Sequence, residues 1–104
     1  LQVSALSVTP YAIYPAYGEV TFINYTISEE ATVSVDILDP SGNLVRNLVT
    51  DELKTAGEHN VMWNAKNNSG LIIATAGDYW VRVTMKDATG FTTKTRVGNI
   101  SILR

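Results

Sequence analysis

The 104-residue sequence contains no cysteine and few charged residues, and each scarcity excludes a class of site. Without cysteine the chain cannot form disulfides, thiolate zinc sites or a cysteine nucleophile, so its stability must come from packing. Eight basic and ten acidic residues leave a net charge of -2, with no basic stripe to bind nucleic acid. Apolar runs are also short, as at residues 71–73, so no membrane insertion is predicted.

Helical spacing of apolar residues is nearly absent, whereas alternation at period two recurs between clusters of Gly, Pro, Asn and Asp. Residues 19–27, 31–38, 58–63 and 77–86 alternate most clearly. We therefore predict an all-β, immunoglobulin-like (fibronectin III-like) sandwich of two antiparallel sheets with about seven to eight strands. A small barrel is the structural alternative. A chain of this length forms one core, so residues 1–104 are predicted to be a single domain.

Turn-forming residues separate the middle strands. A hairpin turn is predicted at residues 39–43, where Pro40 presets a turn dihedral and Gly42 tolerates a positive φ. The chain then returns as a strand over residues 44–50. A loop is expected over residues 51–57, before the next alternating segment begins.

The last apolar segment, residues 91–103, is long for a single strand. Its alternating pattern follows the odd-numbered positions as far as Val97 and then moves to the even-numbered positions from Ile100. A change of parity beside a glycine is typical of a β-bulge, because one extra residue resets the alternation. A bulge is therefore predicted at Gly98 and Asn99.

A set of landmarks with characteristic spacing follows the order found in a known family. The landmarks are Ala31-Thr32-Val33, Asp39-x-x-Gly42-x-x-Val45-Arg46-x-Leu48, Ala56-Gly57-Glu58-His59-x-Val61-x-Trp63, Ser69-Gly70 and Ala76-Gly77-Asp78-Tyr79. Over residues 15–90 the sequence resembles the immunoglobulin-like domain of flagellar hook-capping proteins, a module that also recurs in secreted bacterial enzymes and surface proteins. The resemblance implies an extracellular or cell-surface domain cut from a larger exported protein. Its partners would be neighbouring domains of the same polypeptide or other surface proteins.

The resemblance also bears on metal binding. Members of the family commonly carry acidic residues in the loop after the tryptophan, where this chain has Asn64, Asn67 and Asn68. Calcium sites take most of their negative charge from carboxylates, so no metal site and no cofactor is predicted here. The asparagines are interpreted as turn formers, because Asn tolerates positive φ and bonds to its own backbone.

Groups suited to catalysis do not converge in the sequence. A hydrolase needs a nucleophile with its base, two converging carboxylates or a metal site. The sole histidine, His59, shares the inward parity of Val61 and Trp63 and is interpreted as half-buried and structural. Most aspartates fall in turns or at outward positions. We therefore predict that the chain is not an enzyme.

The two tryptophans have opposite predicted roles. Trp63 has inward parity and matches the family tryptophan, so it is predicted at the centre of the core. Trp80 alternates with Tyr79 and is predicted to face outward. An exposed tryptophan of this kind stacks on a sugar, packs on a neighbouring domain, or is covered by the stems of Lys94 and Arg96. Cover by these stems is the favoured explanation.

Tyr11, Tyr14 and Tyr17 cluster around two prolines, in a segment too broken by proline for a central strand. Clustered tyrosines offer rigid, amphipathic area that suits recognition, and they equally suit a lid over one end of a sandwich. The lid is the favoured interpretation. Together with Trp80, the three tyrosines are the candidate ligand or partner surface.

The leading functional hypothesis is a non-catalytic structural spacer or docking module of a multidomain exported bacterial protein. Two alternatives stay open. The first is a carbohydrate-binding module that holds a polysaccharide on at least two coplanar exposed aromatic rings, a hypothesis that a buried Trp80 would exclude. The second is a flagellar hook-cap assembly domain, in which such domains contact one another.

Overall fold

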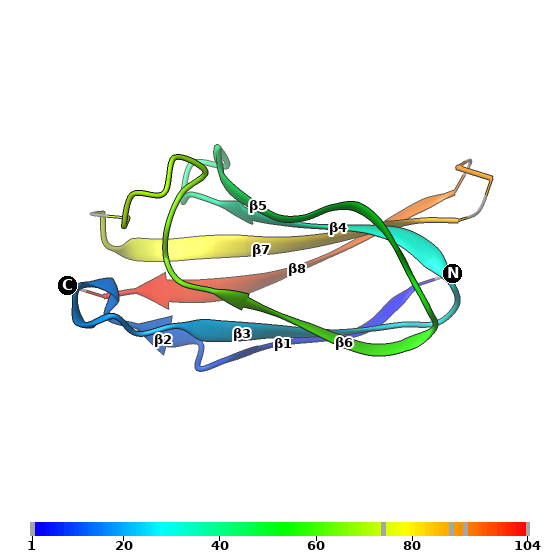
Figure 1. Ribbon diagram of the computed structural model, residues 1–104, viewed down its shortest axis with the longest axis horizontal. Coiled ribbons are helices and arrows are strands. Elements are labelled where there is room, and N and C mark those ends of the chain that lie inside the picture. Colours follow the sequence, from blue (N-terminus) through cyan, green and yellow to red (C-terminus); the bar gives the residue numbers. More distant parts are fainter. Residues whose placement is uncertain (1, 74, 88, 91, 104) are drawn as a thin grey trace.

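Two β-sheets pack face to face in the computed structural model of the chain (Figure 1). Residues 2–73, 75–87, 89–90 and 92–103, which are those the structure describes, form eight strands and one 3₁₀ helix. The elements are β1 (Val3–Thr9), β2 (Ala12–Ile13), η1 (Pro15–Tyr17), β3 (Thr21–Ile27), β4 (Ala31–Leu38), β5 (Leu44–Lys54), β6 (Gly57–Trp63), β7 (Gly77–Lys86) and β8 (Thr93–Ile102). The predicted all-β sandwich is confirmed. Within the described ranges, no helix is long and apolar enough to cross a membrane.

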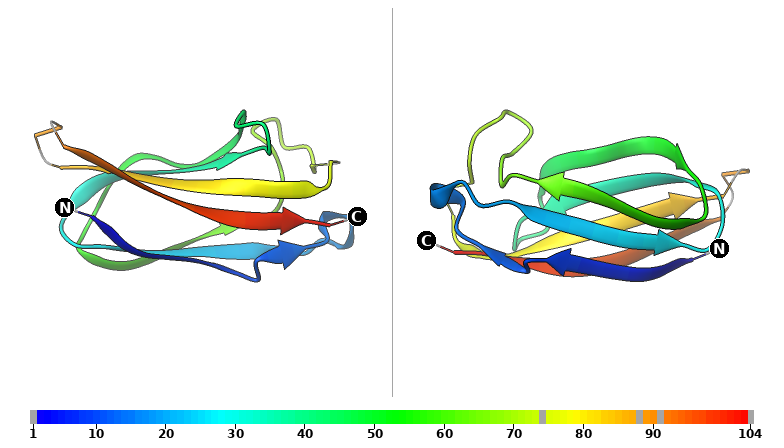
Figure 2. Two further views of the ribbon diagram at one scale, coloured as in Figure 1. Left: turned by 180° about the vertical axis from the view of Figure 1, so that it is seen from behind. Right: turned by 60° about the horizontal axis from the view of Figure 1, so that its bottom comes forward.

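The smaller sheet has the strand order β1-β3-β6, and both of its pairs are antiparallel. β3 lies in the middle and alternates strictly, with Ile23, Tyr25 and Ile27 buried against the other sheet. The side chains between them therefore face outward. The right view of Figure 2 turns this sheet toward the reader.

The larger sheet has the strand order β2-β8-β7-β4-β5. β7 pairs with β4 on one side and β8 on the other, and it buries Val81, Val83 and Met85. A strand paired on both sides is central, so β7 lies inside the larger sheet. β2 pairs with the end of β8 in the parallel direction, so this sheet is not wholly antiparallel.

The core is built from aliphatic side chains of both sheets, with Trp63 among them. The Trp63 side chain is fully buried, and its ring centroid lies 6.5 Å from that of Tyr79. Its Nε1 donates a hydrogen bond to the backbone carbonyl of Lys66 at 3.0 Å, which satisfies the one polar group of the buried indole. The predicted core position of Trp63 is confirmed.

β5 continues through Asp51 to Lys54, so the loop expected over residues 51–57 was wrong in its extent and covers only residues 55–56. The pairing register between β4 and β5 shifts between Val33 and Val35, where β5 carries an extra residue. Asp51 adopts a φ of 46° there, and its backbone N–H donates to Ser34 Oγ at 3.1 Å. Such a bulge lets the strand continue where the polar sequence suggests a break.

The bulge predicted at Gly98 and Asn99 was also wrong, because β8 pairs with β7 without a register shift. Gly98 lies opposite the buried Val81, so the even-numbered residues of β8 face into the sandwich and Val97 faces outward. A Cβ atom at Gly98 would lie only 3.3 Å from a methyl group of Leu6 in β1. The glycine is therefore explained by close approach of the two sheets.

The domain is elongated, with principal extents of 42 × 22 × 20 Å. The two ends of the chain lie at opposite ends of the long axis, as the N and C marks show (Figure 1). β1 begins at one end and β8 finishes at the other. Arg96 links these two strands, since its Nη1 donates to the carbonyls of Val3 and Ser4, each at 3.2 Å.

Candidate functional site

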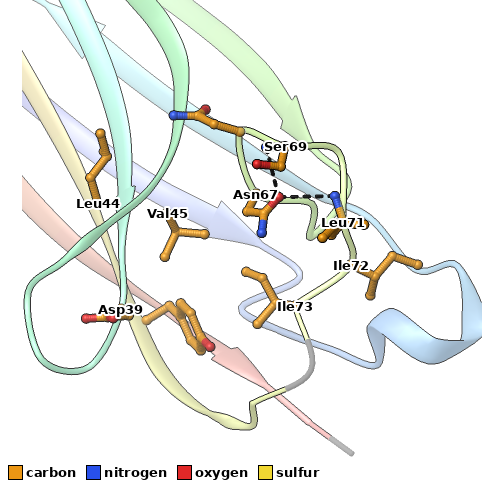
Figure 3. A pocket seen from close by; sticks show the side chains of 10 residues that line it. Asp39, Leu44, Val45, Asn67, Ser69, Leu71, Ile72 and Ile73 are labelled. Atoms are coloured by element: carbon orange, nitrogen blue, oxygen red, sulfur yellow. Dashed lines mark hydrogen bonds between the residues drawn. The ribbon is translucent and has the colours of Figure 1, made fainter.

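A pocket of about 550 Å³ opens between the β4–β5 hairpin and the loop that follows β6 (Figure 3). We call it the end pocket. Val45, Ile73 and Tyr79 are its buried or half-buried apolar side chains, whereas Leu44, Leu71 and Ile72 are exposed at its margin. The end pocket thus offers both apolar and polar surface to solvent, in nearly equal parts.

The polar side chains of the end pocket are occupied in holding its two loops. Asp39 Oδ1 accepts the backbone N–H groups of Ser41 and Asn43 at 2.9 and 2.8 Å. Asn67 Oδ1 accepts the N–H groups of Ser69 and Leu71 at 2.9 and 3.1 Å, the latter pair visible in Figure 3. These oxygens define the loops and leave the apolar side chains as the contact surface.

Hydrogen bonding in the hairpin turn, above all from the Asn43 backbone N–H, lowers the pKa of Asp39 below its ordinary value of 3.8. A carboxyl with a depressed pKa stabilises the fold above its unfolded pKa, and this stabilisation is lost as pH falls through the folded value. We predict that an NMR titration of the Asp39 carboxyl carbon has a midpoint below 3.8. A midpoint at or above that value would contradict the turn geometry.

The loop after β6 carries the three asparagines that stand where the family commonly has acidic residues. Asn64 Oδ1 accepts the Lys66 N–H at 3.3 Å, and Asn68 Nδ2 donates to Asn47 Oδ1 at 3.1 Å. The bonds of Asn64 and Asn67 within the loop support the turn-forming interpretation, whereas Asn68 joins the loop to β5. Over the part of the chain that the structure describes, no three His, Cys, Asp or Glu side chains are grouped to hold a metal ion.

A row of polar side chains crosses the outer face of the larger sheet, and the sequence did not reveal it. Asp36 is only 8% exposed although it occupies an outward position. Its Oδ2 accepts from Arg82 Nη2 at 3.1 Å, and its Oδ1 accepts from Asn47 Nδ2 at 2.7 Å. The row joins β7, β4 and β5, so its role is to fix strand pairing.

Trp80 faces outward on β7 and is 38% exposed, as predicted. Its cross-strand neighbours are Leu38 and Asn99. The expected cover by Lys94 and Arg96 was wrong, because these residues lie opposite Met85 and Val83 and therefore on the other face of the sheet. Trp80 is thus a partly accessible aromatic side chain flanked by an apolar residue and an amide.

The tyrosine segment crosses one end of the sandwich, but the tyrosine rings do not form the lid that was favoured. Tyr11 and Tyr17 are 72% and 77% exposed, while Ile13 and Pro15 are the buried residues of the segment. The rings of Tyr14 and Tyr17 lie 5.5 Å apart with planes inclined by 39°. This pair is exposed but tilted, so it does not supply the coplanar platform that the carbohydrate hypothesis requires.

His59 is half-buried and makes structural contacts, as the sequence indicated. Its ring stacks on Tyr25 with centroids 5.5 Å apart and planes inclined by 30°. Its Nε2 lies 2.7 Å from the backbone carbonyl of Thr55. The imidazole is thus engaged with a buried ring and a backbone oxygen, the contacts of a residue that holds the start of β6.

Comparison with known proteins agrees with this geometry. The profile of the FlgD Ig-like domain family matches residues 16–89, close to the range over which the resemblance was noted. A solved structure of FlgD from P. aeruginosa superimposes with a TM-score of 0.69 at 18% sequence identity. The match covers 97% of this chain and 76% of that one, and at this identity it shows a shared fold. No curated protein gave a significant match.

Proposed function

The chain belongs to the FlgD Ig-like domain family, and from this we propose that it is a non-catalytic structural spacer or docking module of an exported bacterial protein. The observation that carries the proposal is the placement of the chain ends at opposite ends of a 42 Å long axis (Figure 1). Segments attached to these ends would be held apart along one direction. The domain would act outside the cell or at its surface, within a multidomain protein.

Anchoring of both ends supports a spacing role. Val3 at the start of β1 and Ile102 at the end of β8 are buried in the core. The Arg96 hydrogen bonds to the start of β1 tie the two sheets together. A segment attached at either end therefore continues from an ordered strand, and conformational freedom is confined to the junction itself.

The spacing role predicts a narrow distance distribution between two reporter domains fused to the two ends. Each reporter would carry one spin label on a cysteine, since this chain has none to compete. Pulsed electron resonance should give a much narrower distribution than a Gly/Ser linker of equal residue number, because such linkers behave as random coils. A distribution as broad as that of the linker would overturn the spacing proposal.

Docking is the second candidate, and the end pocket favours it. Leu44, Leu71 and Ile72 expose apolar surface around one opening. Exposed apolar side chains that gather at one place are typical of protein contact surfaces. Hook-cap assembly is one form of docking, and concentration-dependent solution mass of the isolated chain would favour it over pure spacing.

A further inference from the structure

The outer face of the smaller sheet carries a groove of about 390 Å³, which shares no lining residue with the end pocket. We call it the amide groove, and its lining residues are Ala5, Ser7, Asn24, Tyr25, Thr26, Glu58, His59 and Asn60. Its volume lies in the range of about 300–1,000 Å³ typical of small-molecule sites. The strands that form it, β1, β3 and β6, lie side by side in the right view of Figure 2.

Strand register sets the side chains of the amide groove in transverse rows. Asn24 on β3 pairs with Ser7 on β1 and with Asn60 on β6, so the three side chains form one row. The next row contains Thr26 and Glu58. Directly opposed side chains have Cβ atoms about 4.5–5.5 Å apart, so two amides and a hydroxyl face solvent within reach of one small ligand.

These polar groups are available for a ligand, in contrast to those of the end pocket. Within the described residues, the side chains of Ser7, Asn24 and Asn60 form no hydrogen bond, and the Glu58 carboxylate forms neither a hydrogen bond nor an ion pair. Asn24 is half-buried, so its amide is partly withdrawn from water without an internal partner. The groove therefore presents donors and acceptors that are not used by the fold.

An apolar row borders the amide row on the same face. Phe22 and Met62 are cross-strand partners, and each is 46% exposed. A half-exposed aromatic ring beside hydrogen-bonding side chains matches a ligand with an apolar face and a polar edge. Pyranose sugars have this character, since their axial C–H groups form a face and their hydroxyl groups form the rim.

We propose that the amide groove binds a neutral oligosaccharide, with a sugar ring on Phe22 and hydroxyl groups on Asn24 and Asn60. Each amide offers both a donor and an acceptor, which suits neighbouring hydroxyls, and the Glu58 carboxylate accepts from a further hydroxyl. Among the described residues that line the groove, Glu58 is the only acidic one and none is a lysine or arginine, so anionic sugars are repelled. The inference goes beyond the spacing function and does not depend on it.

The test is an NMR titration of the full chain with neutral hexasaccharides of glucose, of mannose and of N-acetylglucosamine, and with oligogalacturonate as the anionic probe. Binding of at least one neutral probe should shift amide resonances of β1, β3 and β6. The Asn60→Ala and Phe22→Ala variants should each weaken that binding about three- to tenfold, the loss expected for one hydrogen bond or ring contact. Trp80→Ala, on the opposite sheet, is the matched control and should change it less than about twofold.

Two results would overturn the proposal. One is the absence of shifts on β1, β3 and β6 with every neutral probe at millimolar concentration. The other is binding that Trp80→Ala removes while Asn60→Ala leaves it intact, which would place the ligand on the larger sheet. Because Phe22 and Asn60 are exposed, circular dichroism of the variants should match that of the parent chain, so that loss of binding is not loss of folding.

Discussion

Replacing Trp63 with alanine is expected to lower the free energy of unfolding by about 3–5 kcal/mol, the usual cost of emptying a buried aromatic site. The indole is fully buried, packs against Tyr79, and satisfies its own N–H on the Lys66 carbonyl. Since a domain of this size is stable by only about 5–15 kcal/mol, the change should remove a large share of the total stability.

Urea unfolding followed by circular dichroism would measure this effect. The matched control is Trp80→Ala, which removes the same side chain from the outer face and should cost about 1 kcal/mol or less, because Trp80 is partly exposed. Should the alanine variant fail to fold, Trp63→Phe keeps a ring and loses the N–H bond, at a cost of about 1–3 kcal/mol. Equal losses at Trp63 and Trp80 would contradict the assigned core.

Replacing Ile13 with alanine is expected to cost about 2–5 kcal/mol, although β2 has only two residues. Ile13 is fully buried and pairs with Ile102 at the end of β8. Its carbonyl accepts the Leu103 N–H at 2.9 Å, and the Tyr11 carbonyl accepts the Ser101 N–H at 2.7 Å. Loss of the side chain opens one end of the core.

Tyr11→Ala is the control for Ile13→Ala. Tyr11 lies two residues away, its side chain is exposed, and the substitution leaves its backbone hydrogen bond with Ser101 in place. Its effect on urea unfolding should stay within about 0.5 kcal/mol. Hydrogen exchange of the Leu103 amide would report directly on β2, and it should accelerate in Ile13→Ala alone. If instead Tyr11→Ala were the more damaging change, the tyrosines would form the lid after all.

Strands could be predicted from strict alternation wherever one face of the strand is buried and the other faces solvent. Val33, Val35 and Ile37 are buried between sheets, so β4 was predicted with its observed bounds. β8 was misread because its inward positions at one side of the sandwich remain open to solvent. Arg96 occupies such a position, where its stem crosses to β1 and its guanidinium reaches backbone carbonyls. Because Arg96 is polar, the sequence pattern assigned its position to the outward face of β8, which was wrong.

Contacts between distant residues lie beyond what a single sequence offers. Asp36 and Arg82 are 46 positions apart, and nothing in their local patterns pairs them. The lid was misassigned because three tyrosines and one isoleucine share a proline-rich segment. Only the parallel pairing of β2 with β8 shows that Ile13 is the residue that covers the end of the core. The end pocket likewise depends on how two loops meet, although its apolar residues 71–73 stood out in the sequence.

The placement of the chain ends has a consequence for tension. A force that pulls the two ends apart acts along the length of β1 and β8, because each strand runs parallel to the long axis (Figure 1). β1 is held by β3 and β8 by β7, in ladders that extend over nearly the whole of each strand. Such a force shears these hydrogen bonds together instead of unzipping them one by one. The domain is thereby suited to remain folded under tension along its long axis.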